Sequence, residues 1–245
     1  IFISIEFQDL ELRTPLQLNF LTEFDENKHT IDHVARKYLE QASKSVQHLI
    51  PIKTSPDGNC LFHSIVSLIS NPMISIVEMR GLSYFSYTSS RIEFSEVKKL
   101  NRMILVRTVV ELVKHKDYHV NQYSHLVGAF DKALQRVCNA GSFCELHEIV
   151  ALTNVLQCQI QSVYPYLDYR AEMKIMNAVY KPLSQSACTE RLIIFWTNTQ
   201  DEFLVRNRPG CRGVWSPNHF VPLISPNRLS RLNPTDEVTV IPQVV

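Results

Sequence analysis

The stretch Asp57-Gly58-Asn59-Cys60-Leu61-Phe62 constrains this chain more than any other. Residues 56–59 are all turn formers, and Asn71-Pro72 sets the far limit of the element that follows. The apolar residues between these limits recur at the spacing of one helix face: Leu61, Phe62, Ile65, Leu68 and Ile69. Cys60 is therefore expected on the first turn of a helix, where unpaired N–H groups and the helix dipole favour an anion. Such a position is expected to lower the pKa of the thiol and to favour the nucleophilic thiolate.

A cysteine nucleophile needs a base, and the sequence offers one far downstream. His219 stands at the start of a short apolar run that continues to Ile224. A reactive cysteine with a remote histidine is typical of cysteine hydrolases, because the two residues meet in space and not in sequence. We therefore take Cys60 and His219 as the candidate nucleophile and base.

The motif around Cys60 resembles the D-G-N-C-L-F signature of the ovarian-tumour (OTU) family of cysteine proteases, most of which are deubiquitinases. His219-Phe220 is similar to the histidine-aromatic element near the end of that family's domain. Leu105 to Thr108 and Glu145 to Leu156 are similar to two of its helices. More loosely, the run from Asn59 to Ile224 resembles the vertnin-like, transposon-associated branch of OTU sequences. Only the Cys60 motif is highly specific.

The resemblance implies a mechanism without a cofactor and a ubiquitin or ubiquitin-like partner. Cys60 would attack the carbonyl carbon of an isopeptide or peptide bond, and His219 would move the proton to the leaving amine. The backbone N–H groups of Asp57, Gly58, Asn59 and Cys60 are candidates for the oxyanion donors. The resemblance also gives Asp57 a catalytic role, although a turn cap of the loop explains an aspartate there equally well.

One position departs from the family pattern. Members often have Asp or Asn two residues after the histidine, where its side chain orients the imidazole, but this chain has Val221. Asn218, directly before His219, is one substitute, and Asp57 is another. A histidine without an orienting partner is a weaker base because its tautomer is not fixed. The departure bears on activity and not on fold.

Several other residues have two interpretations. Trp215 and Phe220 are candidates for the substrate channel, but Trp215 serves equally well as a buried anchor beside the strand. His63 is three residues after Cys60, and its helical position directs it along the helix instead of into the cleft. Arg206, Arg208 and Arg212 form a basic loop, either a solvated face or a contact for an acidic partner or the ubiquitin tail.

No metal site is expected. The candidate ligands are the pair His115 and His119, and the loose group Cys138, Cys144 and His147. Neither set matches a zinc spacing with four convincing ligands.

Composition excludes some classes of function. Hydrophobic residues make up 45% and charged residues 20%, as in an ordinary globular protein, and the net charge of +1 gives no signal for nucleic acid or a membrane surface. No apolar run approaches the ~20 residues that span a bilayer. Six cysteines without a CxxC pair favour reduced thiols and an intracellular location, in the cytoplasm, the nucleus or both. The oligomeric state is not indicated.

The order of elements predicts an α+β fold, a small central sheet packed between helices, because helical patterns come first and strands later. Helices are expected over residues 31–50, 75–85, 95–115, 123–137 and 145–156, the last opened by a Ser142–Glu145 capping box, with a polar loop at 86–91. Strands are expected at 1–7, 158–164, 192–196 and 219–224. Pro222 favours an edge position or a bulge for the last strand.

We divide the chain into an N-terminal arm at 1–50, an OTU-like catalytic domain at 51–225 and a C-terminal tail or linker at 226–245. The first residue is Ile1 and not Met, so we expect a piece of a longer protein.

Three functions fit the pattern. The leading one is a cysteine-type deubiquitinase with a Cys60–His219 dyad completed by Asp57 or Asn218. The alternative, motivated by Val221 and the vertnin-like resemblance, is a weak or inactive OTU fold kept as a binding or regulatory module of a transposon-derived or chromatin-associated protein. A third option is a viral-type peptidase that processes its own polyprotein.

Overall fold

The computed structural model describes residues 19–69, 96–139, 141–168, 170–184, 190–210 and 212–227. Six expected features lie outside these ranges: the strand at 1–7, the Asn71-Pro72 limit of the helix that carries Cys60, the helix at 75–85, the loop at 86–91, the residue Ser95 and all of the tail after 227.

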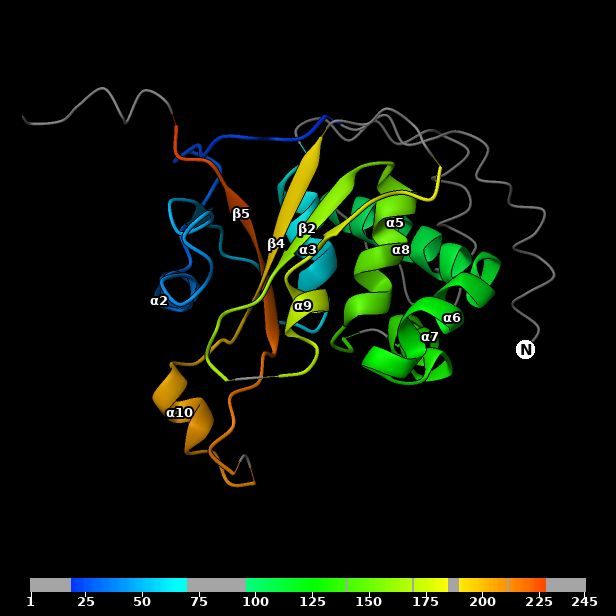
Figure 1. The fold of residues 1–245 in the computed structure, drawn as a ribbon. Helices are drawn as coiled ribbons and strands as arrows, with labels where there is room; N and C mark the ends of the chain where they lie inside the picture. Colours follow the sequence, from blue (N-terminus) through cyan, green and yellow to red (C-terminus); the bar gives the residue numbers. More distant parts are fainter. Residues whose placement is uncertain are drawn as a thin grey trace, which may run out of the picture.

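A five-stranded mixed sheet in the order β1-β5-β4-β2-β3 forms the centre of the fold (Figure 1). Its strands are β1 (Ile50–Pro51), β2 (Gln159–Val163), β3 (Val179–Tyr180), β4 (Arg191–Thr197) and β5 (His219–Ile224). The β2–β4 pair is parallel and the other pairs are antiparallel. Strand β4 is central because its apolar run, predicted at 192–196, packs against neighbours on both faces.

Strand β5, which carries the candidate base, does not lie at the edge as Pro222 suggested. It pairs with β4 on one side and with the short β1 on the other. The carbonyl of Pro222 accepts a hydrogen bond from the Ile52 N–H at 3.0 Å. Because the N and C=O of one residue point to the same side of an antiparallel strand, the missing N–H of Pro222 faces β1. The ladder with β4 therefore loses no hydrogen bond to the proline.

Helices cover both faces of the sheet, which confirms the α+β class. Figure 1 shows α3 (Cys60–Ser67), α5 (Glu96–Lys114) and α8 (Leu146–Leu156) on one side and α2 (His33–Leu39) on the other. The remaining helices are α6 (Lys116–Val127), α7 (Phe130–Cys138), α9 (Met173–Met176) and α10 (Glu202–Arg206). The helices expected at 95–115 and 145–156 are confirmed as α5 and α8.

The helix predicted over 31–50 is much shorter than expected. Asp32 caps α2 by accepting a hydrogen bond from the Ala35 N–H at 2.8 Å, and the helix ends at Leu39. Turns follow, in which the Gln47 amide donates to the carbonyls of Glu40 and Ala42 at 2.8 and 2.9 Å. The apolar residues that predicted the helix are nevertheless buried: Tyr38, Ala42, Val46 and Leu49. The apolar pattern predicted these buried residues correctly, but it did not predict their backbone conformation.

The helix predicted over 123–137 is two helices, α6 and α7. Gly128 separates them with φ of 96°, a conformation that glycine alone adopts readily.

The N-cap of α8 was also placed too early. Glu145, and not Ser142, is the N-cap, and it forms the capping box with Glu148, whose carboxylate accepts from the Glu145 N–H at 3.0 Å.

One core joins these elements, and it includes residues on both sides of position 51. Ala35, Tyr38 and Leu39 of α2 belong to the same buried cluster as Cys60 and Phe220. The division of the chain at residues 50 and 225 stays a prediction. Within the described ranges, none of the helices has the length and apolar content to cross a membrane.

Candidate active site

The turn before α3 positions Cys60 as the first residue of the helix. The Asp57 carboxylate accepts a hydrogen bond from the Asn59 N–H at 2.9 Å, which closes the turn. Gly58 has φ of 84°, and Asn59 is the N-cap of α3 without a capping bond from its own side chain. The backbone of 57–60 thus leads directly into the helix N-terminus, as the sequence predicted.

The backbone at Gly141 lies directly over this turn. A Cβ atom added to Gly58 would lie 1.8 Å from the Gly141 carbonyl oxygen. The Gly141 N–H also donates to the Asn59 side-chain oxygen at 3.4 Å. No residue but glycine fits at position 58, because the second loop occupies the space a side chain would need.

The structure brings Phe220, the residue after His219, to the helix that carries Cys60. Helix α3 packs on β5, and the Ser64 hydroxyl lies between the two: its Oγ is 2.7 Å from the Cys60 carbonyl and 3.1 Å from the Phe220 carbonyl. Two segments that are 156 residues apart in sequence are therefore joined through one serine. Cys60 is 1% exposed and His219 is 2% exposed, so both lie below the surface.

The expected lowering of the Cys60 pKa is not found. Burial raises the pKa of the thiol to about 11, although the backbone N–H groups of Phe220 and Leu61 favour the thiolate. The nearby carboxylate of Asp57 acts in the same direction as burial. The helix N-terminus is present, but loss of solvent outweighs its effect on the sulfur.

Burial also lowers the pKa of His219, which keeps the ring neutral near neutral pH. The carboxylates of Asp32 and Asp57 oppose this shift but do not overcome it. The Nε2 atom of His219 is 3.1 Å from the Thr54 hydroxyl. In the described part of the chain, Nδ1 has no hydrogen-bond partner. Near neutral pH, these pKa shifts favour a neutral thiol at Cys60 and a neutral imidazole at His219.

Asp57 pairs with His63 instead of His219. The Nε2 atom of His63 is 2.9 and 3.1 Å from the two carboxylate oxygens of Asp57, so the imidazole is directed back along α3 toward the turn. Partial burial raises the pKa of Asp57, but the bonds from His63 and the Asn59 N–H outweigh it and bring the pKa below its usual value. Asp57 thus serves as the turn cap, and its role toward His219 is long-range.

The Asn218 amide is directed to the loop after β4. Its side-chain oxygen accepts from the Thr199 N–H at 3.0 Å, and its nitrogen lies 3.2 Å from the Thr199 hydroxyl. These contacts turn the amide toward Thr199, while the imidazole of His219 contacts Thr54.

Trp215 and Phe220 both lie in the core. Trp215 packs between Tyr38 and Tyr164, with ring centroids at 5.2 and 5.5 Å. Phe220 stacks on Phe143 at 5.0 Å and contacts Trp196 at 4.4 Å. Of the two interpretations of Trp215, the buried anchor describes the observed position.

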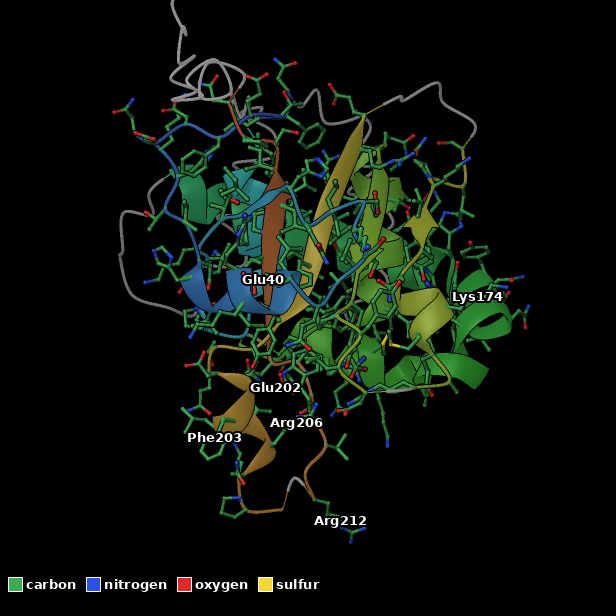
Figure 2. All side chains as sticks on the ribbon, turned by 60° about the vertical axis from the view of Figure 1, so that its left-hand side comes forward. Glu40, Lys174, Glu202, Phe203, Arg206 and Arg212 are labelled. Atoms are coloured by element: carbon green, nitrogen blue, oxygen red, sulfur yellow. The ribbon has the colours of Figure 1, made fainter. Side chains whose placement is uncertain are left out.

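The basic loop is partly neutralised by its own neighbours. Arg206 pairs with Glu202 at 2.7 Å and with Asp168 at 2.9 Å, and it also donates to the Gly213 carbonyl. Figure 2 shows Phe203 on α10 and Arg212 at the tip of this segment, which projects away from the sheet.

Two of the three histidines considered as metal ligands, His119 and His147, sit in an aromatic cluster. His119 is buried against His147 and Phe130, with ring centroids at 5.7 and 5.9 Å. Burial and the neighbouring His147 lower the pKa of His119 to about 4. Among the described residues, no three His, Cys, Asp or Glu side chains gather in a way that would hold a metal ion.

Sequence analysis did not identify Thr54. Its hydroxyl contacts both His219 and the Phe220 carbonyl, yet it lies 165 residues before the histidine. A single threonine in a short segment after a proline has no motif that could have marked it.

The structure thus contains a buried cysteine at a helix N-terminus that packs against a strand beginning with histidine, within an α+β fold. The family described as "Vertnin, OTU domain" matches residues 51–197, more than half of the chain. This chain belongs to the vertnin OTU domain family.

A curated relative and several solved structures are similar to the chain. Vertnin of Danio rerio is 31% identical over 114 residues, which cover 46% of this chain and 15% of that protein. The chain thus spans only a small part of this relative. The OTU domain of OTUD1 superposes with a TM-score of 0.41 at 14% identity, covering 78% of this chain and 93% of that one.

Two viral domains are also similar. The OTU domain protease of Taggert virus gives a TM-score of 0.38 at 12% identity, covering 84% of this chain and 93% of that one. The Hazara virus OTU, solved bound to ubiquitin, gives 0.35 at 11% identity, covering 84% and 94%.

Proposed function

We propose that the chain is a cysteine-type deubiquitinase domain with Cys60 as the nucleophile and His219 as the base. The observation that carries the proposal is the junction between α3 and β5. Ser64 joins the carbonyls of Cys60 and Phe220, and the Phe220 N–H lies where it favours a thiolate at Cys60. The nucleophile and the residue beside the base thus share one buried contact.

The reaction passes one proton through His219 in each of its two halves. As the Cys60 sulfur bonds to the carbonyl carbon, its proton passes to His219. The attack therefore does not need a thiolate beforehand, although the pKa of the thiol is about 11. The C–N bond then breaks, His219 gives the proton to the leaving amine, and a thioester remains. Water then attacks the thioester as His219 takes one of its protons. The C–S bond breaks, His219 gives this proton to the Cys60 sulfur, and the product leaves as a carboxylic acid.

The turn 57–60 and the start of α3 supply the donors for the oxyanion, except for the Asn59 N–H, which donates to the Asp57 carboxylate at 2.9 Å. Backbone N–H groups at the start of α3 have no acceptor within the helix, and the Gly141 contact holds the turn in place. Donors that are fixed before the reaction stabilise the oxyanion without reorganisation.

The ubiquitin part of the proposal comes from family membership and not from the geometry. OTU domains are mostly deubiquitinases, and a fluorogenic ubiquitin with a C-terminal amide tests the assignment. We expect hydrolysis by the wild type and none by Cys60→Ser. Cys158→Ala is the matched control, because Cys158 is also a buried cysteine but lies between α8 and β2. Equal hydrolysis by wild type and Cys60→Ser would rule out the cysteine mechanism.

A second candidate function is a binding module without turnover. Three observations favour it: the burial of Cys60 and His219, the raised thiol pKa, and the loop at Gly141 that covers the turn. A ubiquitin titration followed by NMR separates the two functions. Saturable shifts at residues around α3 and β5 without any hydrolysis would favour the module.

A further inference from the structure

The imidazole of His219 has a partner that the family pattern does not predict. The Thr54 hydroxyl lies 3.1 Å from His219 Nε2 and 2.7 Å from the Phe220 carbonyl. We propose that Thr54 is the positioning residue of His219, taking the place that Val221 leaves without a polar side chain. The proposal deepens the proposed function and rests on it for its catalytic meaning.

The hydrogen bonds of Thr54 select one tautomer of the ring. A hydroxyl has one proton, and a carbonyl oxygen can only accept. The 2.7 Å contact therefore takes the Thr54 proton to the Phe220 carbonyl. The Thr54 oxygen must then accept from His219, so Nε2 carries the ring proton and Nδ1 carries the lone pair. Nδ1, which has no partner in the described residues, becomes the atom that receives the Cys60 proton.

Thr54 is held rigidly enough to serve this role. The two residues before it pair on opposite sides: the Ile52 N–H donates to the Pro222 carbonyl at 3.0 Å, and the Lys53 N–H donates to the Thr30 carbonyl at 2.7 Å. Thr54 itself is 9% exposed. The backbone ladder thus fixes the hydroxyl beside β5 before any substrate arrives, which is the condition for an effective positioning group.

The two residues that the sequence offered for this role are engaged elsewhere. Asn218 bonds to Thr199, and Asp57 bonds to His63. The Asp57 carboxylate still favours a charged His219 through space, but a through-space charge does not choose between the two ring nitrogens.

The test compares Thr54→Val with Thr54→Ser in two measurements. Long-range proton–nitrogen NMR spectra report the tautomer, with the His219 signals assigned by their loss in His219→Gln. We expect the Nε2–H tautomer in the wild type and in Thr54→Ser, and a mixture of tautomers in Thr54→Val. For the ubiquitin amide, we expect kcat/KM to fall roughly 10- to 100-fold in Thr54→Val, since hydrogen bonds to charged groups contribute about 1.5–3 kcal/mol.

Two controls separate this role from a structural one. In Thr54→Val the Ser64 hydroxyl still lies 3.1 Å from the Phe220 carbonyl, so this carbonyl keeps a polar neighbour. Thr108→Val removes a similar buried hydroxyl, which donates to the Ile104 carbonyl at 2.7 Å, and should leave the His219 tautomer unchanged. If Thr54→Val does not fold, its thermal midpoint will show this. The wild type is then compared with Thr54→Ser alone.

The outcomes distinguish this inference from the proposed function. An Nδ1–H tautomer in the wild type, or a tautomer that changes in Asn218→Ala but not in Thr54→Val, overturns the role of Thr54. If the wild type hydrolyses no ubiquitin substrate while the tautomer still follows Thr54, the positioning role stands and the proposed activity fails.

Discussion

At Cys60, two effects act on one sulfur in opposite directions. Backbone N–H groups at the start of α3 and from Phe220 favour the thiolate, while burial of a 1% exposed side chain favours the thiol. Burial has the larger effect, because removing the thiolate charge from water costs more free energy than its interactions with a few N–H groups provide. The position of the nucleophile could be predicted from sequence, but its protonation state could not, since burial depends on residues such as Gly141 and Phe220 that are distant in the chain.

The first prediction concerns the reactivity of Cys60 in the free protein. A pKa of about 11 means that the rate of alkylation by iodoacetamide rises with pH throughout the range from 6 to 10, with no plateau at acidic pH. Mass spectrometry of the Cys60 peptide measures this rate, and the exposed Cys138 provides an internal comparison. A fast, pH-independent rate below pH 7 would instead indicate a thiolate–imidazolium pair.

The second prediction concerns the acidic side of the activity profile. The pKa of His219 is lowered by burial, so the ring keeps its lone pair below the usual value of about 6.5. We expect kcat/KM for the ubiquitin amide to fall on acidification with an apparent pKa below 6.5. An acidic limb centred well above 6.5 would contradict the neutral, buried base.

At the level of elements, the turn before α3 and the loop at Gly141 form one unit. Gly58 has a positive φ, and its Cα faces the Gly141 carbonyl with no room for a methyl group. The D-G-N-C motif therefore has a structural reason for its glycine. The loop at Gly141, and not the turn alone, excludes every residue other than glycine from position 58.

Gly58→Ala tests this unit, with Gly210→Ala as the matched control. Gly210 has φ of 88° and no atom within 4 Å of an added Cβ, so alanine there meets only backbone strain, about 1–2 kcal/mol. At Gly58, the same strain is joined by a clash at 1.8 Å. We expect Gly58→Ala to lower the thermal midpoint far more than Gly210→Ala. Similar midpoints would show that the two loops separate easily.

Element boundaries show where sequence patterns succeed and where they fail. Strands β2 and β4 and helices α5 and α8 were predicted because each carries a long, regular apolar pattern. The helix prediction over 31–50 was wrong because apolar residues at helical spacing can also be buried by turns, as Ala42 and Val46 are. Thr54 could not be found at all, because its role depends on a strand pairing and not on a local pattern.

At the level of the whole molecule, the buried histidines link stability to pH. His119 has a pKa of about 4 in the folded protein and about 6.5 when unfolded. Below pH 6.5, the unfolded chain therefore binds more protons at this residue, and stability falls as the pH drops from about 6.5 to 4. His29, His147 and His219, whose pKa values burial also lowers, add to the effect in the same direction.

His119→Phe tests this link. Both ring nitrogens of His119 are buried without a hydrogen-bond partner in the described residues, so phenylalanine should be tolerated in the aromatic cluster. We expect the free energy of unfolding to fall less between pH 7 and pH 5 in this variant, by about 2 kcal/mol. Urea unfolding at both pH values measures the difference. His33→Phe, at the exposed start of α2, is the control, and an equal response from both variants would contradict the account.

The most direct test of the central claim is reaction with a ubiquitin that carries an electrophile at its C-terminus. The account predicts a covalent adduct in the wild type, mapped to Cys60, that is absent in Cys60→Ala and strongly slowed in His219→Ala. A folded protein that forms no adduct, or one whose adduct survives Cys60→Ala, would contradict the assignment of Cys60 and His219 as a deubiquitinase site.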